Sequence, residues 1–112
     1  MNEADLLLDD ANGHLALGEL DQAIALYRKC VDVDQNHFDG WHALGMALMK
    51  NGEIKEAIGC GLKAVSLKPN DLLAWTGLSQ MYVKDGNIPD AEAAKQNATI
   101  LSIGGRVDKN AK

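Results

Sequence analysis

The residues of this sequence best equipped for metal binding or nucleophilic chemistry are its three histidines and two cysteines: His14, His37, His42, Cys30 and Cys60. His37 and His42 are five residues apart, which places them off a common helical face, and no Cys or Glu-x-x-His motif supports a zinc site. The two cysteines make neither a disulfide framework nor a metal spacing. We therefore predict no metal site. Cys30 is interpreted as a small buried residue, whereas Cys60 could be either that or a reactive thiol near Lys63.

The sequence also lacks the combinations of residues on which enzymes rely. It has no nucleophile accompanied by a base and an orienting group, no Gly-rich phosphate-binding loop and no Gly-x-Ser-x-Gly motif. Gly104-Gly105 is interpreted as a helix terminator. We expect a protein that is not an enzyme and needs no cofactor.

The charge of the chain argues against two classes of partner. The formal net charge is −5, whereas nucleic-acid binders usually carry a basic face that neutralises phosphates. No basic amphipathic stretch suits a membrane surface, and no apolar run approaches the roughly 18 residues of a membrane span. The first five residues lack the basic region of a signal peptide. We expect no nucleic-acid partner, no membrane partner and a reducing cytoplasmic location.

Any functional residue must be positioned by elements that repeat every 34 residues. The segment Gly-Glu-Leu-Asp-Gln-Ala-Ile at 18–24 returns as Gly-Glu-Ile-Lys-Glu-Ala-Ile at 52–58, and more weakly at 86–91. Apolar residues recur at the three- and four-residue steps of amphipathic helices, and glycine marks the stop between them. The sequence predicts helices near 3–17, 21–34, 38–51, 55–68, 72–85 and 89–103. Asp71 is expected to cap the fifth, and Pro89 to stand at the start of the sixth.

This pattern resembles the tetratricopeptide repeat family. The second unit, 38–71, carries the family residues Trp41, Leu44, Gly45, Ala57, Ala64 and Pro69. The third unit, 72–105, departs more from the pattern, and the first, 4–37, is degenerate. The resemblance implies an all-α fold, a right-handed superhelix (α-solenoid) of three antiparallel helix-turn-helix repeats. It implies a single domain over 1–105, and we expect 106–112 to form a polar, frayed C-terminal tail.

Two glycines interrupt the helix expected at 55–68. Each costs roughly 1 kcal/mol relative to alanine in a helix interior. One interpretation is close packing, with Gly61 making room for a large neighbour such as Trp75. The alternative is that Gly59 marks a place where a partner approaches the convex side.

In the tetratricopeptide repeat family the first helix of each repeat lines a concave groove, and the resemblance implies a partner-binding set here. That set comprises Leu8, Asn12, Leu15, Asp39, His42, Met46, Met49, Leu73, Thr76, Gln80, Val83 and Lys84. Its apolar members are expected at positions not needed for core packing, where methionine suits an adaptable surface. We expect a non-enzymatic adaptor that binds a peptide or helix of a partner protein.

The identity of that partner is constrained in one respect. Relatives that grip the acidic C-terminal tails of chaperones use a clamp of Lys, Asn, Asn, Lys and Arg. The matching positions here are Leu8, Asn12, Ala43, Leu73 and Gly77, so only Asn12 agrees with the clamp. The cations that would hold a carboxylate are missing, and we expect no chaperone tail.

The alternative function is that of a self-associating architectural unit without a separate ligand. Ile100 and Ile103 of the last helix could be covered by a second copy, which leaves a homodimer open. The polar residues around Lys95 favour instead a final repeat that caps the array itself.

Overall fold

The computed structural model describes residues 1–108, and all regular secondary structure within that range is α-helical. The elements are α1 (Glu3–Ala16), α2 (Leu20–Val33), α3 (Phe38–Lys50), α4 (Ile54–Leu67), α5 (Leu72–Lys84) and α6 (Ile88–Ser102). Each lies within one residue of its predicted bounds, so the helix predictions are confirmed.

Turns and caps at equivalent places set these boundaries. Gly18, Gly52 and Gly86 end the first helices of the three pairs at φ values of 78°, 84° and 78°, which is left-handed backbone that favours glycine. At the start of α5, Asp71 accepts a hydrogen bond from the amide of Ala74 at 3.0 Å, as predicted. Pro89 stands in the first turn of α6, which is also as predicted.

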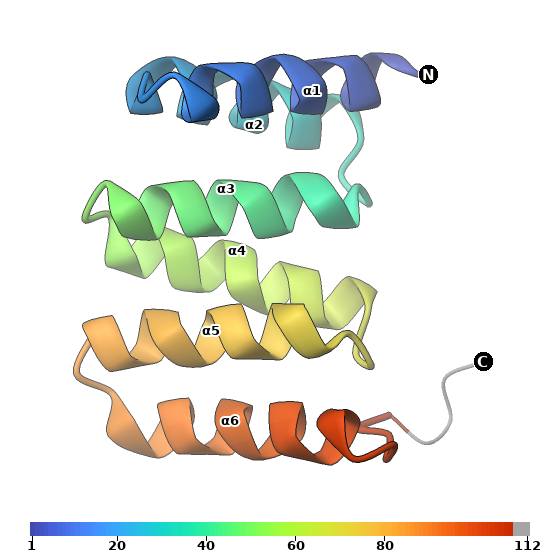
Figure 1. Cartoon of the computed structure of the whole chain (residues 1–112), viewed down its shortest axis with the longest axis vertical. Coiled ribbons are helices and arrows are strands. Elements are labelled where there is room, and N and C mark those ends of the chain that lie inside the picture. Colours follow the sequence, from blue (N-terminus) through green and yellow to red (C-terminus); the bar gives the residue numbers. More distant parts are fainter. Residues whose placement is uncertain (109–112) are drawn as a thin grey trace.

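The six helices are stacked in chain order along the longest dimension of the molecule, from α1 to α6 (Figure 1). Besides its neighbours in the chain, α3 contacts both α1 and α5. In the described part of the chain, by contrast, no Cα atom of α2 approaches one of α4 within 8 Å, and the same holds for α4 and α6. The first helices of the pairs therefore form a continuous layer, while the second helices are spread apart on the other side.

The core runs through all three pairs. Its largest fully buried side chains are Tyr27, Leu48, Leu78, Met81 and Cys30, and no polar or charged residue of the described range is buried. Trp41 and Trp75 are only half-buried. Their indole N–H groups donate to the carbonyl oxygens of Gln35 and Pro69, each at 2.8 Å, so each tryptophan ties its repeat to the end of the preceding one.

Gly61 belongs to this packed interior. A Cβ atom at this position would lie 2.9 Å from the Sδ atom of Met81 and 3.0 Å from the Cδ1 atom of Leu78. The prediction of close packing is confirmed, whereas the predicted neighbour, Trp75, was wrong.

The chain after α6 folds back onto the junction between α4 and α5. The amides of Val107 and Asp108 donate to the Oδ1 atom of Asn70 at 2.9 and 3.1 Å. The prediction of a frayed tail was wrong for these residues, and the rest of that tail, 109–112, lies outside the described residues. No helix within 1–108 has both the length and the hydropathy needed to cross a membrane.

Candidate functional site

The predicted partner-binding residues all belong to the first helices of the three pairs. They are Leu8, Asn12 and Leu15 on α1, Asp39, His42, Met46 and Met49 on α3, and Leu73, Thr76, Gln80, Val83 and Lys84 on α5. Because α3 contacts both α1 and α5, the three helices present one layer. We refer to the surface of this layer as the α1–α3–α5 face.

The centre of this face depends on a glycine. A Cβ atom on Gly77 of α5 would lie 3.2 Å from the Sδ atom of Met46 and 3.3 Å from the Cε1 atom of His42. The missing side chain thus lets two predicted binding residues of α3 pack directly on α5. The His42 ring stacks in turn on Phe38, with ring centroids 6.0 Å apart and the planes 6° from parallel.

The apolar members of the set divide into two groups. Leu8, Leu15, Met46 and Met49 are partly buried and pack against the core, so the prediction that the core does not need them was wrong for these four. Leu73 and Val83 of α5, by contrast, are 67% and 55% exposed. Exposed apolar residues on a helix over which a flexible methionine packs are what an adaptable binding surface offers.

Two polar members use their side chains within the protein. Asn12 accepts a hydrogen bond from the hydroxyl of Tyr27 at 2.6 Å, which joins α1 to α2, and burial raises the pKa of Tyr27. The hydroxyl of Thr76 donates to the carbonyl of Leu72 at 2.9 Å. Asp39, at the start of α3, is exposed, as are Gln80 and Lys84 of α5, so these three side chains reach into solvent.

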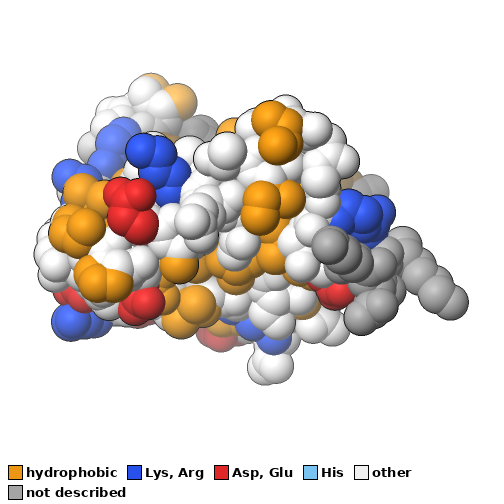
Figure 2. Space-filling view, turned by 90° about the horizontal axis from the view of Figure 1, so that it is seen from below, with side chains coloured by type: hydrophobic (Ala, Val, Ile, Leu, Met, Phe, Trp, Pro, Cys, Tyr) orange, Lys and Arg blue, Asp and Glu red, His pale blue; other side chains and the backbone are white. Residues whose placement is uncertain are grey.

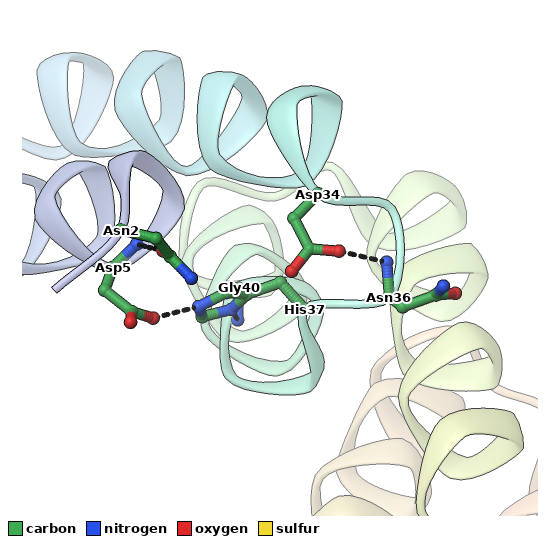
Figure 3. Close-up of polar contacts among 6 residues, drawn as sticks. All are labelled: Asn2, Asp5, Asp34, Asn36, His37 and Gly40. Atoms are coloured by element: carbon green, nitrogen blue, oxygen red, sulfur yellow. Dashed lines mark hydrogen bonds and ion pairs between the residues drawn. The ribbon is translucent and has the colours of Figure 1, made fainter.

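A network of polar contacts joins the starts of α1 and α3 (Figure 3). The Nδ1 atom of His37 accepts the amide hydrogen of Gly40 at 2.9 Å, which caps α3. Its Nε2 atom therefore carries the ring hydrogen and donates to the Oδ1 atom of Asp5, at 2.7 Å. Next to it, Asp34 accepts from the amide of Asn36 at 3.0 Å. The ring of His37 thus orients α1 relative to α3 at one end of the face.

The cysteines are poorly suited to chemistry. Cys30 and Cys60 are both buried and free. Burial raises the pKa of both thiols, that of Cys60 to about 11. Among residues 1–108 no group of three His, Cys, Asp or Glu residues is placed to hold a metal ion.

Comparison with protein-family models matches two stretches of the chain. Residues 11–52 match a model described as "TPR repeat", and residues 38–71 match one described as "Tetratricopeptide repeat". The chain belongs to the tetratricopeptide repeat (TPR) family. A comparison with curated protein sequences found no match.

Solved TPR structures have the same fold as this TPR chain. The second TPR of Spaghetti (RPAP3), bound to an HSP90 peptide, is 20% identical at a TM-score of 0.85, covering 89% of this chain and 93% of that one. The Sgt2 TPR domain from Aspergillus fumigatus is 20% identical at 0.86, covering 96% and 72%. MamA AMB-1 is 23% identical at 0.86, covering 95% of this chain and 58% of that one. These likenesses establish the all-α superhelical repeat fold.

Sequence reasoning did not find the long-range polar contacts of this TPR protein. His37 lies 32 positions from its partner Asp5. The Nζ atom of Lys68, at the end of α4, lies 4.6 Å from the ring centroid of Phe38, at the start of α3 in the same pair. The only sequence signal for the first contact was the 34-residue register, which brings the equivalent starts of α1 and α3 together, and the second contact had none.

Proposed function

We propose that this protein is a non-enzymatic protein-interaction module, and that its α1–α3–α5 face binds a helix or an extended peptide of a partner protein. The predicted contact residues on α1, α3 and α5 would line the bound segment. The free, buried cysteines are consistent with a reducing compartment such as the cytoplasm.

The observation that carries this proposal is the apolar surface of α5. Leu73 and Val83 of α5 are more than half exposed, although the opposite side of the same helix packs in the core. On the same helix Met46 of α3 packs over Gly77, so an unbranched, polarizable side chain lies on α5 between these two positions in the sequence. A partner segment that buried the two exposed residues would gain about 25 cal/mol for each Å² of apolar surface removed from water.

The peptide ligand of a similar structure supports the ligand class but not that ligand. The second TPR of Spaghetti (RPAP3) is bound to an HSP90 peptide. Here the positions that would clamp an acidic chaperone tail carry Leu8, Ala43, Leu73 and Gly77, none of which offers a cation. The remaining one, Asn12, already accepts a hydrogen bond from Tyr27. We propose that the bound segment is held mainly by apolar contacts.

The test removes the exposed apolar surface without disturbing the core. Partners captured from source-cell lysate by the wild type are compared with those captured by a Leu73→Glu, Val83→Glu variant. A Leu62→Glu variant is the matched control, because Leu62 is also exposed, at 47%, but belongs to α4. Partners lost only with the α5 variant, at unchanged helicity and melting temperature, are the expected result. Partners retained by all three proteins would rule out this face.

The second candidate function is self-association through the end of the array. Ile100, in the last turn of α6, and Ile103, just after that helix, are 39% and 81% exposed. Figure 2 looks onto this end of the pile, and hydrophobic side chains gather across its middle while charged side chains lie mainly toward its edges. Light scattering over a hundredfold range of concentration separates the two candidates. A constant monomer mass removes self-association, whereas a dimer lost on Ile103→Lys establishes it.

A further inference from the structure

The spreading of α2 and α4 leaves a hollowed surface on the side away from the α1–α3–α5 face. Two adjoining hollows of about 410 and 420 Å³ lie there. Both are lined by Val31, Asp32, Trp41 and Gly59. We call this surface, with α2 and α4 as its walls, the Trp41 groove.

Trp41 supplies a fixed aromatic surface in the groove. Trp41 belongs to α3, which lies between the two walls. Its indole N–H donates a hydrogen bond to the carbonyl of Gln35 at 2.8 Å. A fixed ring needs no ordering when a ligand lies against it, which lowers the entropic cost of binding.

Gly59 opens the wall formed by α4. A Cβ atom at Gly59 would meet nothing within 4 Å, in contrast to Gly61 two residues later, which is closely packed. Packing inside the protein therefore does not require the glycine, although it costs roughly 1 kcal/mol relative to alanine in an exposed helix interior. Its bare backbone lets another chain approach α4 more closely than any side chain would allow.

The charges of the two walls are arranged in opposite order. At one end Arg28 of α2 pairs with Glu56 of α4, with the Nη2 and Oε1 atoms 3.0 Å apart. Farther along, Asp32 of α2 and Lys63 of α4 line the groove, and neither forms an ion pair with a described residue. At this end of the groove an anion on α2 and a cation on α4 thus face a ligand across the same opening.

We propose that the Trp41 groove binds an extended peptide of a partner protein in which a basic residue is next to an acidic one. The peptide backbone lies along Trp41 and Gly59. Because successive side chains of an extended chain point to opposite sides, the basic side chain reaches Asp32 on one wall and the acidic side chain reaches Lys63 on the other. A helix would present side chains to Gly59 and leave the bare backbone unused.

The test uses four hexapeptides that differ at the two central positions. Each has Ala-Val before and Val-Ala after a centre of Arg-Glu, Arg-Arg, Glu-Glu or Gln-Gln. Binding is followed by NMR on the indole N–H signals of the ¹⁵N-labelled full chain, where the signal of Trp75 is the internal control. The expected result is that Arg-Glu shifts the Trp41 signal alone and binds at least about tenfold more tightly than Gln-Gln.

Two variants distinguish the groove from a non-specific surface. Asp32→Lys places a cation opposite Lys63 at this end of the groove, so Glu-Glu should become the preferred peptide. Gly59→Leu fills the opening with a better helix former, so it should abolish binding without lowering the melting temperature. The proposal is overturned by equal shifts of Trp41 and Trp75, by equal affinity for Arg-Glu and Gln-Gln, by no shift at millimolar peptide, or by a Gly59→Leu protein that binds normally.

Discussion

The outer surface of the array contains the same local architecture twice, once between α2 and α4 and once between α4 and α6. In both places a tryptophan of the intervening helix donates its indole N–H to a carbonyl near the end of the preceding repeat, that of Gln35 or Pro69, each at 2.8 Å. In neither place do Cα atoms of the two outer helices approach within 8 Å in the described chain. The backbone and the tryptophan contact are thus set by the repeat.

The side chains on the walls differ between the two places. Those of the Trp41 groove are Arg28, Asp32, Glu56, Gly59 and Lys63, and their counterparts 34 residues later are Leu62, Ser66, Asp90, Ala93 and Asn97. The second set has a single charge and no glycine. The comparison teaches that the repeat supplies a scaffold, whereas the capacity to bind a charged peptide depends on residues that need not repeat.

The largest effect, a loss of stability, is expected from a substitution at Gly61, the glycine of α4 that faces the interior. Gly61→Phe places a ring where even a Cβ atom would lie within 3.0 Å of Met81 and Leu78. Overpacking of this kind costs about 1–3 kcal/mol, so thermal unfolding followed by circular dichroism should show a melting temperature lower by roughly 10 °C.

The control for Gly61→Phe is the double variant Gly61→Phe, Met81→Ala. It provides space for the ring and should recover part of the loss. Equal melting temperatures for Gly61→Phe and the wild type would show that the interface between the second and third pairs is loosely packed.

The second effect concerns Cys60, which lines the Trp41 groove but is only 4% exposed. Burial, and then the nearby charge of Glu56, raise the pKa of its thiol from 9.0 to about 11. Near pH 8 the reactive thiolate should therefore be roughly 100-fold scarcer than for a free cysteine. Alkylation by iodoacetamide, measured by mass spectrometry, should be slower by at least that factor than in unfolding concentrations of guanidinium. A fast reaction at Cys60 in the folded protein would show that the groove opens in solution.

The sequence allowed the scaffold to be predicted but not the wall contacts. A 34-residue period specifies helix bounds because each helix must bury one stripe, and Asp71 and Pro89 are local signals that depend on few neighbours. The pair Arg28–Glu56 joins residues 28 positions apart, and two residues in matching register need not have side chains that meet. Sequence reasoning also assigned Met46 wholly to binding, because it could not show that Gly77 lets this side chain pack on α5.

The third prediction concerns the exchange of glycine and alanine between the Trp41 groove and the equivalent surface between α4 and α6. Gly59→Ala should raise the free energy of unfolding by up to about 1 kcal/mol, since open space surrounds Gly59 and alanine is the better helix former. Ala93→Gly at the exposed counterpart on α6 should lower it by a similar amount. Urea unfolding of the two single variants and of the exchange measures both effects. A destabilised Gly59→Ala protein would mean that the groove is closed in solution.

The smallest effect is expected from the ion pairs that join neighbouring repeats. Arg28 and Glu56 are 43% and 45% exposed and form two parallel contacts, whereas Lys55, which pairs with Asp85 at the end of α5, is 85% exposed. A double-mutant cycle in urea should give a coupling of about 0.5 kcal/mol for Arg28–Glu56 and less for Lys55–Asp85.

The dependence of this coupling on pH follows from the pKa of Glu56, which its hydrogen bond with Arg28 holds below its ordinary 4.5. A carboxyl whose pKa is lowered by folding stabilises the protein above its unfolded pKa and loses that contribution as the pH falls through the folded value. The Arg28–Glu56 coupling should therefore be constant near neutral pH and decline only below the ordinary carboxyl range. A coupling already lost at neutral pH, or one no larger than that of Lys55–Asp85, would show that the two walls of the Trp41 groove are not joined in solution. In that case the difference between the two outer surfaces would depend on Gly59, Asp32 and Lys63 alone.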